Sequence, residues 1–533
     1  MRTFVFAIGG TGARVLRSLS MLLAGGADGT NIGDEIVPII IDYDRENGDT
    51  DRAQEALDCY EHIHNLCYSK DEEGISGKFF CAPVYKLKDL FGGAGGFEEQ
   101  SRFEIYLKDE DTDKTYADHI GFTTLGDAGN TSPTRHLLEA LYDNSDEKDP
   151  KTELHMNLKK GFKGCPNIGS VVTKSLENSI EIQRFFGLIG PEDRIVIIGS
   201  IFGGTGASGI PTLLDMIQSR GNLDNNLVAV VAITPYFKVD KDGSSAINSD
   251  TFTAKTKAAL DAYELGSSVN VQANAIYYVG DKYQPGTFKN EEGGKEQKND
   301  AHVVELVAAM DVIDFINRDR NTAFPDIHSG RRIPATAFEF GFDDLTPAEI
   351  KAGVDPNLLG FKRFYKTETF DPYLLPLCRL AIFDKFCRNF LLDPSNIQDR
   401  DAWAITSKLK DNKELLKYLK KFCDMFEGWT GELQQSERKR GVAFFNFTKN
   451  YGDLMQGIKA WKPRATVGNH DFGRVELITD DKIRTKLGTY DKLTAAGVDH
   501  KAETSGKPFM KAIDEVIRIL MKESVLSLPK NPY

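Results

Sequence analysis

The chain has 533 residues, of which 41% are hydrophobic and 27% charged, a composition that excludes fibrous and intrinsically disordered classes. Its length exceeds the roughly 250 to 300 residues at which a single hydrophobic core stops growing, so two or three domains are expected. The formal net charge of −13, from 79 acidic and 66 basic side chains, argues against an extended nucleic-acid-binding surface.

Strands and helices alternate from the start of the chain. Arg2–Ile8 is a continuous apolar run that predicts a buried strand, and it is followed by the glycine loop Gly9–Gly12. Apolar residues at helical spacing then predict a helix over Ala13–Leu23. A second buried strand, Ile36–Ile41, ends in an acidic run. Between about 70 and 160 the periodicity is weak, which predicts an irregular insertion.

A turn-rich loop and a second glycine loop follow the insertion. The loop Gly161–Gly169 precedes a predicted helix from Ser170 to Phe186. The strand Arg194–Gly199 then leads into the glycine loop Phe202–Gly209, and a helix is predicted to open near Pro211. This region therefore repeats the order of strand, glycine loop and helix seen at the N-terminus.

The remaining elements complete an α/β pattern. Leu227–Ile233 and Ala275–Val279 predict two more strands, and Asn299–Ile316 predicts a long amphipathic helix. Such alternation is typical of a mainly parallel sheet covered on both faces, which binds ligands beyond the carboxyl ends of its strands. From about residue 371 the chain is predicted to be mostly helical, ending in an amphipathic segment at Pro508–Glu523. We expect a nucleotide-binding domain over 1–320 and a second domain over 321–533.

Glycine loops between strands and helices favour phosphate binding. Glycine lets the main chain approach a phosphate closely, and the free N–H groups of the following helix favour negative charge. The loop Gly9–Gly12 alone would equally suit a Rossmann dinucleotide site or a plain tight turn. Two such loops and the turn-rich loop in one sheet instead predict a polyphosphate surrounded by main-chain concavities.

The second glycine loop resembles the signature of the tubulin/FtsZ superfamily. That signature is GGGTG followed by small residues and, in the bacterial branch, a proline. The matching residues are Gly203, Gly204, Thr205, Gly206 and Pro211. Phe202 stands where the first glycine of the family usually stands, and Ser208 where a later glycine stands. The loop is therefore similar to a divergent bacterial copy of the signature.

Other segments resemble further nucleotide loops of this family, in the same order. Ala7–Gly12 resembles the first phosphate loop, and Gly161–Gly169 resembles the third. The strand that ends at Asp42 and Asp44 resembles the tubulin strand with two acids one residue apart, which implies that both acids lie near Mg²⁺ and the terminal phosphate. A solvated strand end is the alternative interpretation of these two acids.

The resemblance also implies contacts to the nucleoside. Ala232–Phe237 is similar to a strand exit that the family follows with a ribose-contacting acid, for which Asp240 is the candidate. Asn299–Asp300 resembles the Asn-Asp pair of FtsZ proteins, whose acid accepts hydrogen bonds from the two donors of guanine. A turn residue and a helix cap are the respective alternatives for Asp240 and Asp300.

The resemblance covers roughly residues 1–320 and implies a Rossmann-like tubulin/FtsZ GTP-binding domain with a parallel sheet and a long central helix. The ligands it implies are GTP or GDP with Mg²⁺. The predicted nucleotide contacts are Gly9, Gly10, Thr11, Gly12, Asp42, Asp44, Gly164, Asn167, Phe202, Gly203, Gly204, Thr205, Gly206, Ala207, Ser208, Pro235, Asp240, Asn299 and Asp300.

Three functions remain open. GTPases of this family complete their active site through a loop of the next subunit; the corresponding segment Asn317–Asp326 does not reproduce the family spacing, and Asp319 and Asp326 are its candidate catalytic residues. The resemblance implies a GTPase that assembles head to tail into filaments. The alternatives are a GTP-bound scaffold that does not hydrolyse and recruits a partner through its C-terminal region, and an NAD(P)-dependent oxidoreductase.

The cellular location is predicted from two kinds of segment that the sequence lacks, a membrane-spanning run and a signal peptide. No apolar run approaches the roughly 18 to 20 residues of a membrane-spanning helix, and the N-terminus has no signal-peptide layout. Seven cysteines without a CxxC pair favour reduced thiols. The sequence therefore predicts a cytoplasmic protein.

Overall fold

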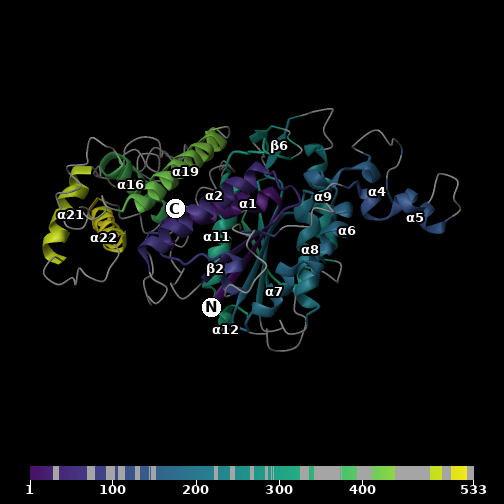
Figure 1. The fold of residues 1–533 in the computed structure, drawn as a ribbon, viewed down its shortest axis with the longest axis horizontal. Coiled ribbons are helices and arrows are strands. Elements are labelled where there is room, and N and C mark those ends of the chain that lie inside the picture. Colours follow the sequence, from purple (N-terminus) through teal and green to yellow (C-terminus); the bar gives the residue numbers. More distant parts are fainter. Residues whose placement is uncertain are drawn as a thin grey trace, which may run out of the picture.

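In the computed structural model, a seven-stranded parallel sheet lies at the centre of the molecule, in the order β3-β2-β1-β4-β5-β7-β9 (Figure 1). The strands are β1 (Arg2–Ile8), β2 (Glu35–Ile41), β3 (Glu104–Ile105), β4 (Arg194–Ser200), β5 (Leu227–Ile233), β7 (Ala275–Val279) and β9 (Thr336–Phe340). The strand order reverses between β1 and β4, and the region beyond the carboxyl ends of these two strands is where a doubly wound sheet binds its ligand.

The structure describes part of the chain. The described residues are 1–27, 35–68, 79–91, 103–105, 114–125, 132–142, 145, 152–220, 226–240, 247–264, 269–281, 286–289, 291, 293–324, 335–340, 373, 375–392, 409, 412–438, 480–494 and 506–524.

Helices cover both faces of the sheet, because alternate strand residues point to opposite sides and nearly all are apolar. Val5 and Ala7 of β1 belong to the core on one face, with α1 (Gly9–Ala24), α2 (Gly48–Cys67) and α11 (Val303–Asn317). Phe4 and Phe6 belong to the core on the other face. The helices of that second face are α6 (Pro166–Thr173), α7 (Ile180–Leu188), α8 (Thr205–Gln218), α9 (Phe252–Glu264) and α10 (Val269–Gln272). The predicted α/β class is confirmed.

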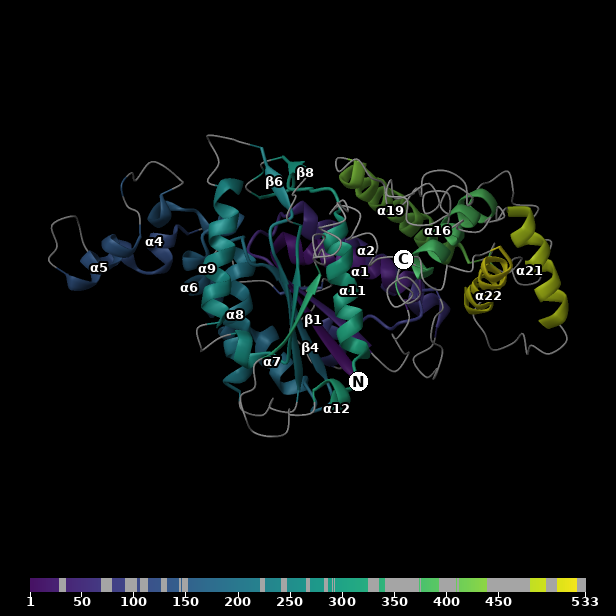
Figure 2. The same ribbon diagram turned by 180° about the vertical axis from the view of Figure 1, so that it is seen from behind.

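From about residue 371 the chain is helical where it is described, as predicted, whereas β9, within the predicted second domain over 321–533, belongs to the central sheet. Its helices are α16 (Leu375–Phe386), a π-helical turn at Cys387–Leu391, α19 (Lys413–Arg438), α21 (Asp480–Thr494) and α22 (Gly506–Ser524). They lie on the side of α1 and α2 away from the sheet, as the view from behind shows (Figure 2). Apolar residues of α16, α19 and α22 share one core with those of α1 and α2.

Several element boundaries differ from the sequence prediction. The helix α1 begins at Gly9, not Ala13, so the first glycine loop is itself the first helical turn. Pro211 lies inside α8, which begins at Thr205; the N–H that proline lacks would have bonded to the carbonyl of Ala207. The predicted helix over 170–186 is divided, because the Ser179 side chain accepts a hydrogen bond from the N–H of Ile182 and starts α7 anew.

Other elements were shifted or missed. The helix α11 begins at Val303, because the His302 side chain accepts from the N–H of Val304 while the Glu305 side chain accepts from the N–H of His302. The edge strand β9 and the small parallel pair β6 (Phe237–Val239) and β8 (Gly286–Phe288) lie in short segments without a clear period. The insertion contains short pieces, among them α4 (Tyr116–His119) and α5 (Pro133–Leu141). Of the helices that the structure describes, none is long and apolar enough to cross a membrane.

Candidate functional site

The two glycine loops meet beyond the carboxyl ends of β1 and β4. A Cβ added to Gly9 would lie 3.3 Å from the Cβ of Thr205, so the first turns of α1 and α8 are in contact. Neither helix has an acidic residue in its first turn. Two helix N-termini therefore direct unpaired N–H groups and positive dipole ends toward one place, where an anion would be stabilised.

Glycine is required in these loops by close packing of the main chain. A Cβ on Gly12 would lie 2.8 Å from the carbonyl carbon of Ala7, and a Cβ on Gly206 only 2.5 Å from the carbonyl oxygen of Ser200. These approaches allow α1 and α8 to begin directly at the strand ends. The glycines thus set the position of both helix N-termini, and Gly12 does so without lining the cleft itself.

The turn-rich loop that begins at Gly161 lies beside the second glycine loop in the cleft lining. Gly161, Lys163 and Gly164 have positive φ angles of +73°, +44° and +79°, and the N–H of Gly161 donates to the carbonyl of Leu158. A Cβ on Gly204 would lie 3.1 Å from the nitrogen of Gly164, so this loop packs directly on the second glycine loop. The Nζ of Lys255, on α9, donates a hydrogen bond of 2.6 Å to the carbonyl of Gly164.

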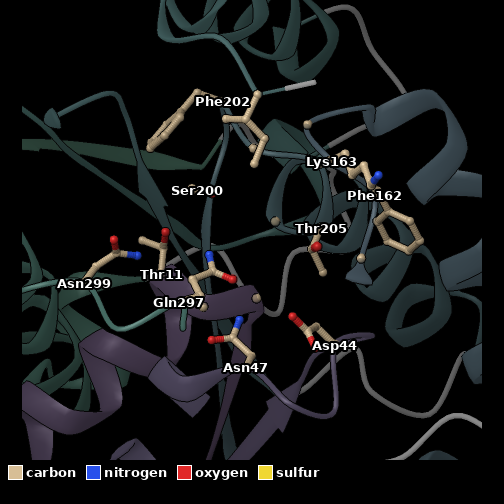
Figure 3. A pocket seen from close by; sticks show the side chains of 18 of the residues that line it. Thr11, Asp44, Asn47, Phe162, Lys163, Ser200, Phe202, Thr205, Gln297 and Asn299 are labelled. Atoms are coloured by element: carbon tan, nitrogen blue, oxygen red, sulfur yellow. The ribbon is translucent and has the colours of Figure 1, made fainter. Parts of the chain in front are cut away.

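One cleft unites these loops (Figure 3). It encloses about 960 Å³ of empty space, part of which is open to solvent. Its lining includes the predicted residues Gly9, Gly10, Thr11, Asp42, Asp44, Gly164, Phe202, Gly203, Gly204, Thr205, Gly206 and Asn299. Residues that the sequence interpretation did not single out also line it, namely Arg14, Asn47, Gly161, Phe162, Lys163, Ser200, Phe237, Val239, Ile247, Phe252, Lys255, Lys289, Glu291 and Gln297.

Other predicted contacts lie outside the cleft lining. The Asn167 side chain is exposed and donates to Glu153, because Pro166 begins α6 and turns Asn167 outward. Ser208 is buried and its hydroxyl donates back to the carbonyl of Gly204. The N–H of Asp240 donates to Phe288, which places Asp240 at the end of the small β6–β8 sheet. The remaining predicted contacts outside the lining are Gly12, Ala207, Pro235 and Asp300.

The packing of the Phe202 side chain accounts for a phenylalanine at the position where the GGGTG pattern has its first glycine. Its ring packs against the rings of Phe252, Phe237 and Tyr236, at centroid distances of 4.9, 5.7 and 6.3 Å. The residue is almost fully buried, so the side chain belongs to an aromatic cluster while the main chain still lines the cleft. A glycine is therefore unnecessary at this position.

Two acids form the negative side of the cleft. Asp42 and Asp44 are buried, and burial, followed by the charge of Asp44, raises the pKa of Asp42 to about 7. One oxygen of Asp42 accepts from the N–H of Asp44 and the other from Nδ2 of Asn47, at 3.2 and 3.0 Å. Asp44 accepts from the N–H groups of Glu46 and Gly294. Two buried carboxylates thus lie side by side at the end of β2, and their mutual repulsion favours a cation between them.

This pair fits a magnesium ion that takes its other ligands from elsewhere. Within the described residues there is no group of three or more His, Cys, Asp or Glu side chains that could hold a metal alone. Mg²⁺ is commonly held by one or two carboxylates together with substrate phosphates and water. Asp42 and Asp44 would hold such an ion, which would neutralise charge on an adjacent phosphate.

A buried arginine links the first glycine loop to α2 and α11. The guanidinium of Arg14 is 3% exposed and donates to the carboxylates of Asp49 and Glu305, each at 2.6 Å, and to the hydroxyl of Tyr236 at 2.7 Å. It also lies 3.3 Å from the hydroxyl of Thr11. Its two carboxylate partners lie 35 and 291 residues away, so no local motif could have indicated this contact.

Of the two candidate catalytic residues, Asp319 is described, and it lies far from this cleft within one chain. Asp319 follows α11 at its C-terminal end, where the carbonyl of the neighbouring Arg318 accepts a hydrogen bond from Arg194 at 2.8 Å. Arg194 is the first residue of β4, so Asp319 lies near the amino ends of the strands. The glycine loops follow the carboxyl ends, at the other end of the sheet. Asp326 lies outside the described residues.

Comparisons with known proteins give little beyond this geometry. No protein-family model and no curated protein matches the sequence. Among solved structures, the chain is similar to CetZ2 from Haloferax volcanii, described as a GTPgS-bound protofilament, with a TM-score of 0.28 and 11% sequence identity. The match covers 63% of this chain and 64% of that one, so less than two thirds of either chain is shared.

Proposed function

We propose that the chain binds a guanine nucleotide with Mg²⁺ in this cleft, as a protein of the tubulin/FtsZ type. The observation that carries the proposal is the contact between Gly9 and Thr205, which brings two glycine loops and two helix N-termini to one site. The phosphates bind the N–H groups of these two loops, beside the turn-rich loop at Gly161–Gly164 that also lines the cleft. The base extends toward Asn299, at the head of α11, where the sequence resemblance expects it.

An oxidoreductase is a weaker interpretation of the same cleft. A dinucleotide site of Rossmann type uses the first glycine loop alone. Here the loops after both β1 and β4 line one cleft, and a dinucleotide site would leave the second loop unexplained. A polyphosphate with its metal accounts for all of these groups.

Hydrolysis by this protein would require a second copy. Asp319, just after α11, lies near the amino ends of the strands, at the opposite end of the sheet from the cleft, so it would reach a nucleotide on another chain and not its own. Head-to-tail contact between copies would bring the two ends together, and repetition of such a contact gives an open filament. The same placement favours the alternative of a GTP-bound scaffold if copies do not assemble.

The direct test identifies the nucleotide that the purified protein retains. Nucleotide is extracted and compared by chromatography with GTP, GDP, ATP and NAD standards, and we expect GTP or GDP. Thr205→Glu places a carboxylate at the start of α8, where it should weaken GTP binding by roughly 100-fold, because juxtaposed like charges cost several kcal/mol.

Gln218→Glu is the matched control, since it adds the same charge at the exposed far end of α8. It should retain nucleotide as the unaltered protein does. Retention of GTP by the Thr205→Glu protein would refute the placement of the phosphates. GTP turnover per chain that rises with protein concentration would support hydrolysis by assembly, and bound GTP that persists at all concentrations would support the scaffold.

A further inference from the structure

Glu432, on the C-terminal helix α19, joins three segments that surround the head of α11. Its carboxylate accepts two hydrogen bonds from the guanidinium of Arg17, on α1, at 2.6 and 3.1 Å. It accepts another from Arg52, on α2, at 3.1 Å. The N–H of Ala301, two residues before α11, donates to it at 2.9 Å. Its side chain is 19% exposed, so these contacts are largely shielded from water.

The same contacts extend to a residue of the cleft wall. Arg52 donates to the carbonyl of Asn299 and, at 2.6 Å, to one oxygen of Asp49. Asp49 in turn accepts from the N–H and the Nδ2 of Asn299, both at 3.0 Å. Asn299 lines the cleft, and its main-chain N–H, its carbonyl and its Nδ2 are therefore held by Arg52 or Asp49. Glu432 holds Arg52 from the other side.

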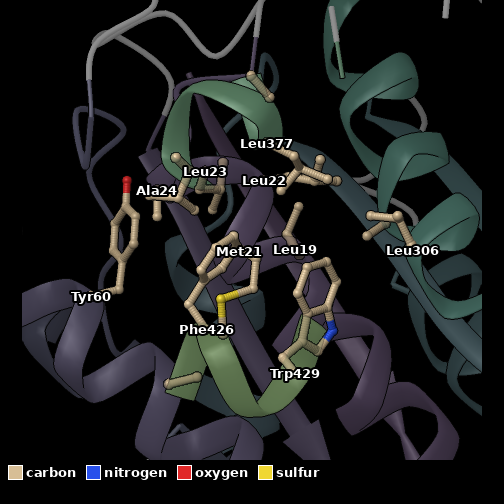
Figure 4. Packing of buried hydrophobic residues seen from close by; sticks show 14 of the residues in the cluster. Leu19, Met21, Leu22, Leu23, Ala24, Tyr60, Leu306, Leu377, Phe426 and Trp429 are labelled. Carbon is tan, nitrogen blue, oxygen red and sulfur yellow. The ribbon is translucent and has the colours of Figure 1, made fainter. Parts of the chain in front are cut away.

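The helix that carries Glu432 is fixed to α1 by apolar packing (Figure 4). Trp429 and Phe426 of α19 are buried beside Leu19 and Met21 of α1. The indole N–H of Trp429 also donates to the hydroxyl of Ser18, at 3.3 Å. Because α1 begins at the first glycine loop, this packing holds α19 in place relative to that loop. The contacts of Glu432 hold it beside the cleft wall at Asn299.

The charges of this cluster are balanced. Arg14, Arg17 and Arg52 face the carboxylates of Asp49, Glu305 and Glu432, three charges of each sign. Loss of the Glu432 charge would leave one positive charge in excess near the cleft. By charge alone, such a change would strengthen the binding of an anionic ligand, not weaken it.

We propose that Glu432 is a positioning residue for the nucleoside end of the cleft, through which the C-terminal region sets the affinity for the base. This inference rests on the proposed function, because it assigns the Asn299 wall to the nucleoside and the glycine loops to the phosphates. The C-terminal helices thereby act on the nucleotide within the same chain. They need no second partner for this effect.

The test compares two ligands on one substitution. Glu432→Gln should weaken GTP binding by about tenfold, within the roughly 5- to 150-fold range of coupling between sites, because the amide cannot hold two arginines and Ala301 together. Inorganic tripolyphosphate contacts only the loops, so its affinity should stay the same or increase. Both affinities are measured by titration calorimetry on the full chain emptied of nucleotide.

Glu427→Gln is the matched control on the same helix. Glu427 is about half exposed and pairs with Lys385 and Arg388 inside the C-terminal region, away from the cleft. It should leave both affinities unchanged. Arg52→Lys is a second variant that keeps the charge but loses the planar fork joining Glu432 to Asn299, and it should reproduce the selective loss of GTP affinity.

The outcomes separate the inference from the proposed function. If the unaltered protein binds no guanine nucleotide, the proposed function fails. If it binds GTP and both variants bind GTP as tightly, the positioning role of Glu432 fails alone. Equal weakening of GTP and tripolyphosphate would also overturn it, because general loosening of the fold would affect both ligands.

Discussion

The two walls of the cleft are built by different means. The glycine wall, from Gly9–Gly12 and Gly203–Gly206, is held by main-chain contacts between residues close in sequence to the strand ends. The polar wall, around Asp49 and Asn299, is held by buried charges from segments up to several hundred residues apart. The first wall is therefore fixed by local backbone geometry and the second by long-range electrostatics. Substitutions in the glycine wall should therefore act by displacing the main chain, and substitutions in the polar wall by leaving buried charges without their partners.

Arg14→Met should give the largest loss of stability, because it removes the cation at the centre of the polar wall. Asp49 and Glu305 would remain buried, each with less compensation. Breaking a buried ion pair by removing one partner costs about 3–5 kcal/mol. The measurement is the free energy of unfolding in urea, without nucleotide.

Lys421→Met is the control for this comparison. Lys421 pairs with Glu55 at 2.9 Å, and the two side chains are 44% and 49% exposed. Its removal should cost about 1 kcal/mol or less, as expected for pairs that solvent screens. Equal losses for the two variants would show that the polar wall does not depend on buried charge.

Gly206→Ala tests the glycine wall and should have the next largest effect. The added Cβ would lie 2.5 and 2.6 Å from the main-chain oxygen and nitrogen of Ser200, atoms that cannot move without displacing β4. Overpacking of this kind costs about 1–3 kcal/mol. Because the displacement separates α8 from β4, phosphate binding should decrease together with the free energy of unfolding.

Gly187→Ala is the matched glycine substitution. Gly187 lies in α7, where an added Cβ would meet no atom within 4 Å. Alanine should stabilise the protein there by up to about 1 kcal/mol, because it favours the helix more than glycine does. A Gly206→Ala protein as stable as the Gly187→Ala protein would contradict the close approach to Ser200.

The difference between the walls also explains what the sequence could predict. Continuous apolar runs predicted β1, β4 and β5, and the glycine loops after β1 and β4 predicted the position of the cleft, since both signals are local. Arg14, Asn47 and Gln297 carry no local signal: their places depend on which distant segments the fold brings together. The nucleoside contacts Asp240 and Asp300 were predicted from resemblance alone, and the structure places Asn299, not these acids, in the cleft lining.

The helix boundaries predicted from the sequence were wrong for a related reason. The periodicity over Ala13–Leu23 indicated α1 but could not show that Gly9 is already helical, because glycine carries no side chain to reveal a face. The start of α11 depended on His302 and Glu305 capping each other, whereas the sequence alone equally allowed Asn299 to begin the helix. The short strand β9 is recognisable mainly through its pairing with β7.

The smallest expected effect concerns pH and measures the negative charge of Asp42 and Asp44, which lie beside the glycine wall and the polar wall in the cleft lining. Burial, followed by the charge of Asp44, raises the pKa of Asp42 from 3.8 to about 7. The folded protein therefore holds this proton more tightly than the unfolded chain does. Its stabilising contribution is complete below about pH 4 and is lost as the pH rises through about 7. From pH 6 to pH 8, metal-free protein should lose about 1.4 kcal/mol of unfolding free energy from this group.

Mg²⁺ should reverse most of that loss, since a cation between Asp42 and Asp44 favours their charged forms. Thermal unfolding with and without Mg²⁺ should then show a larger stabilisation at pH 8 than at pH 6. Asp42→Asn should remove this difference, because one of the two carboxylates that would hold the ion is lost. A Mg²⁺ effect that is equal at both pH values, or that persists in Asp42→Asn, would place the ion elsewhere.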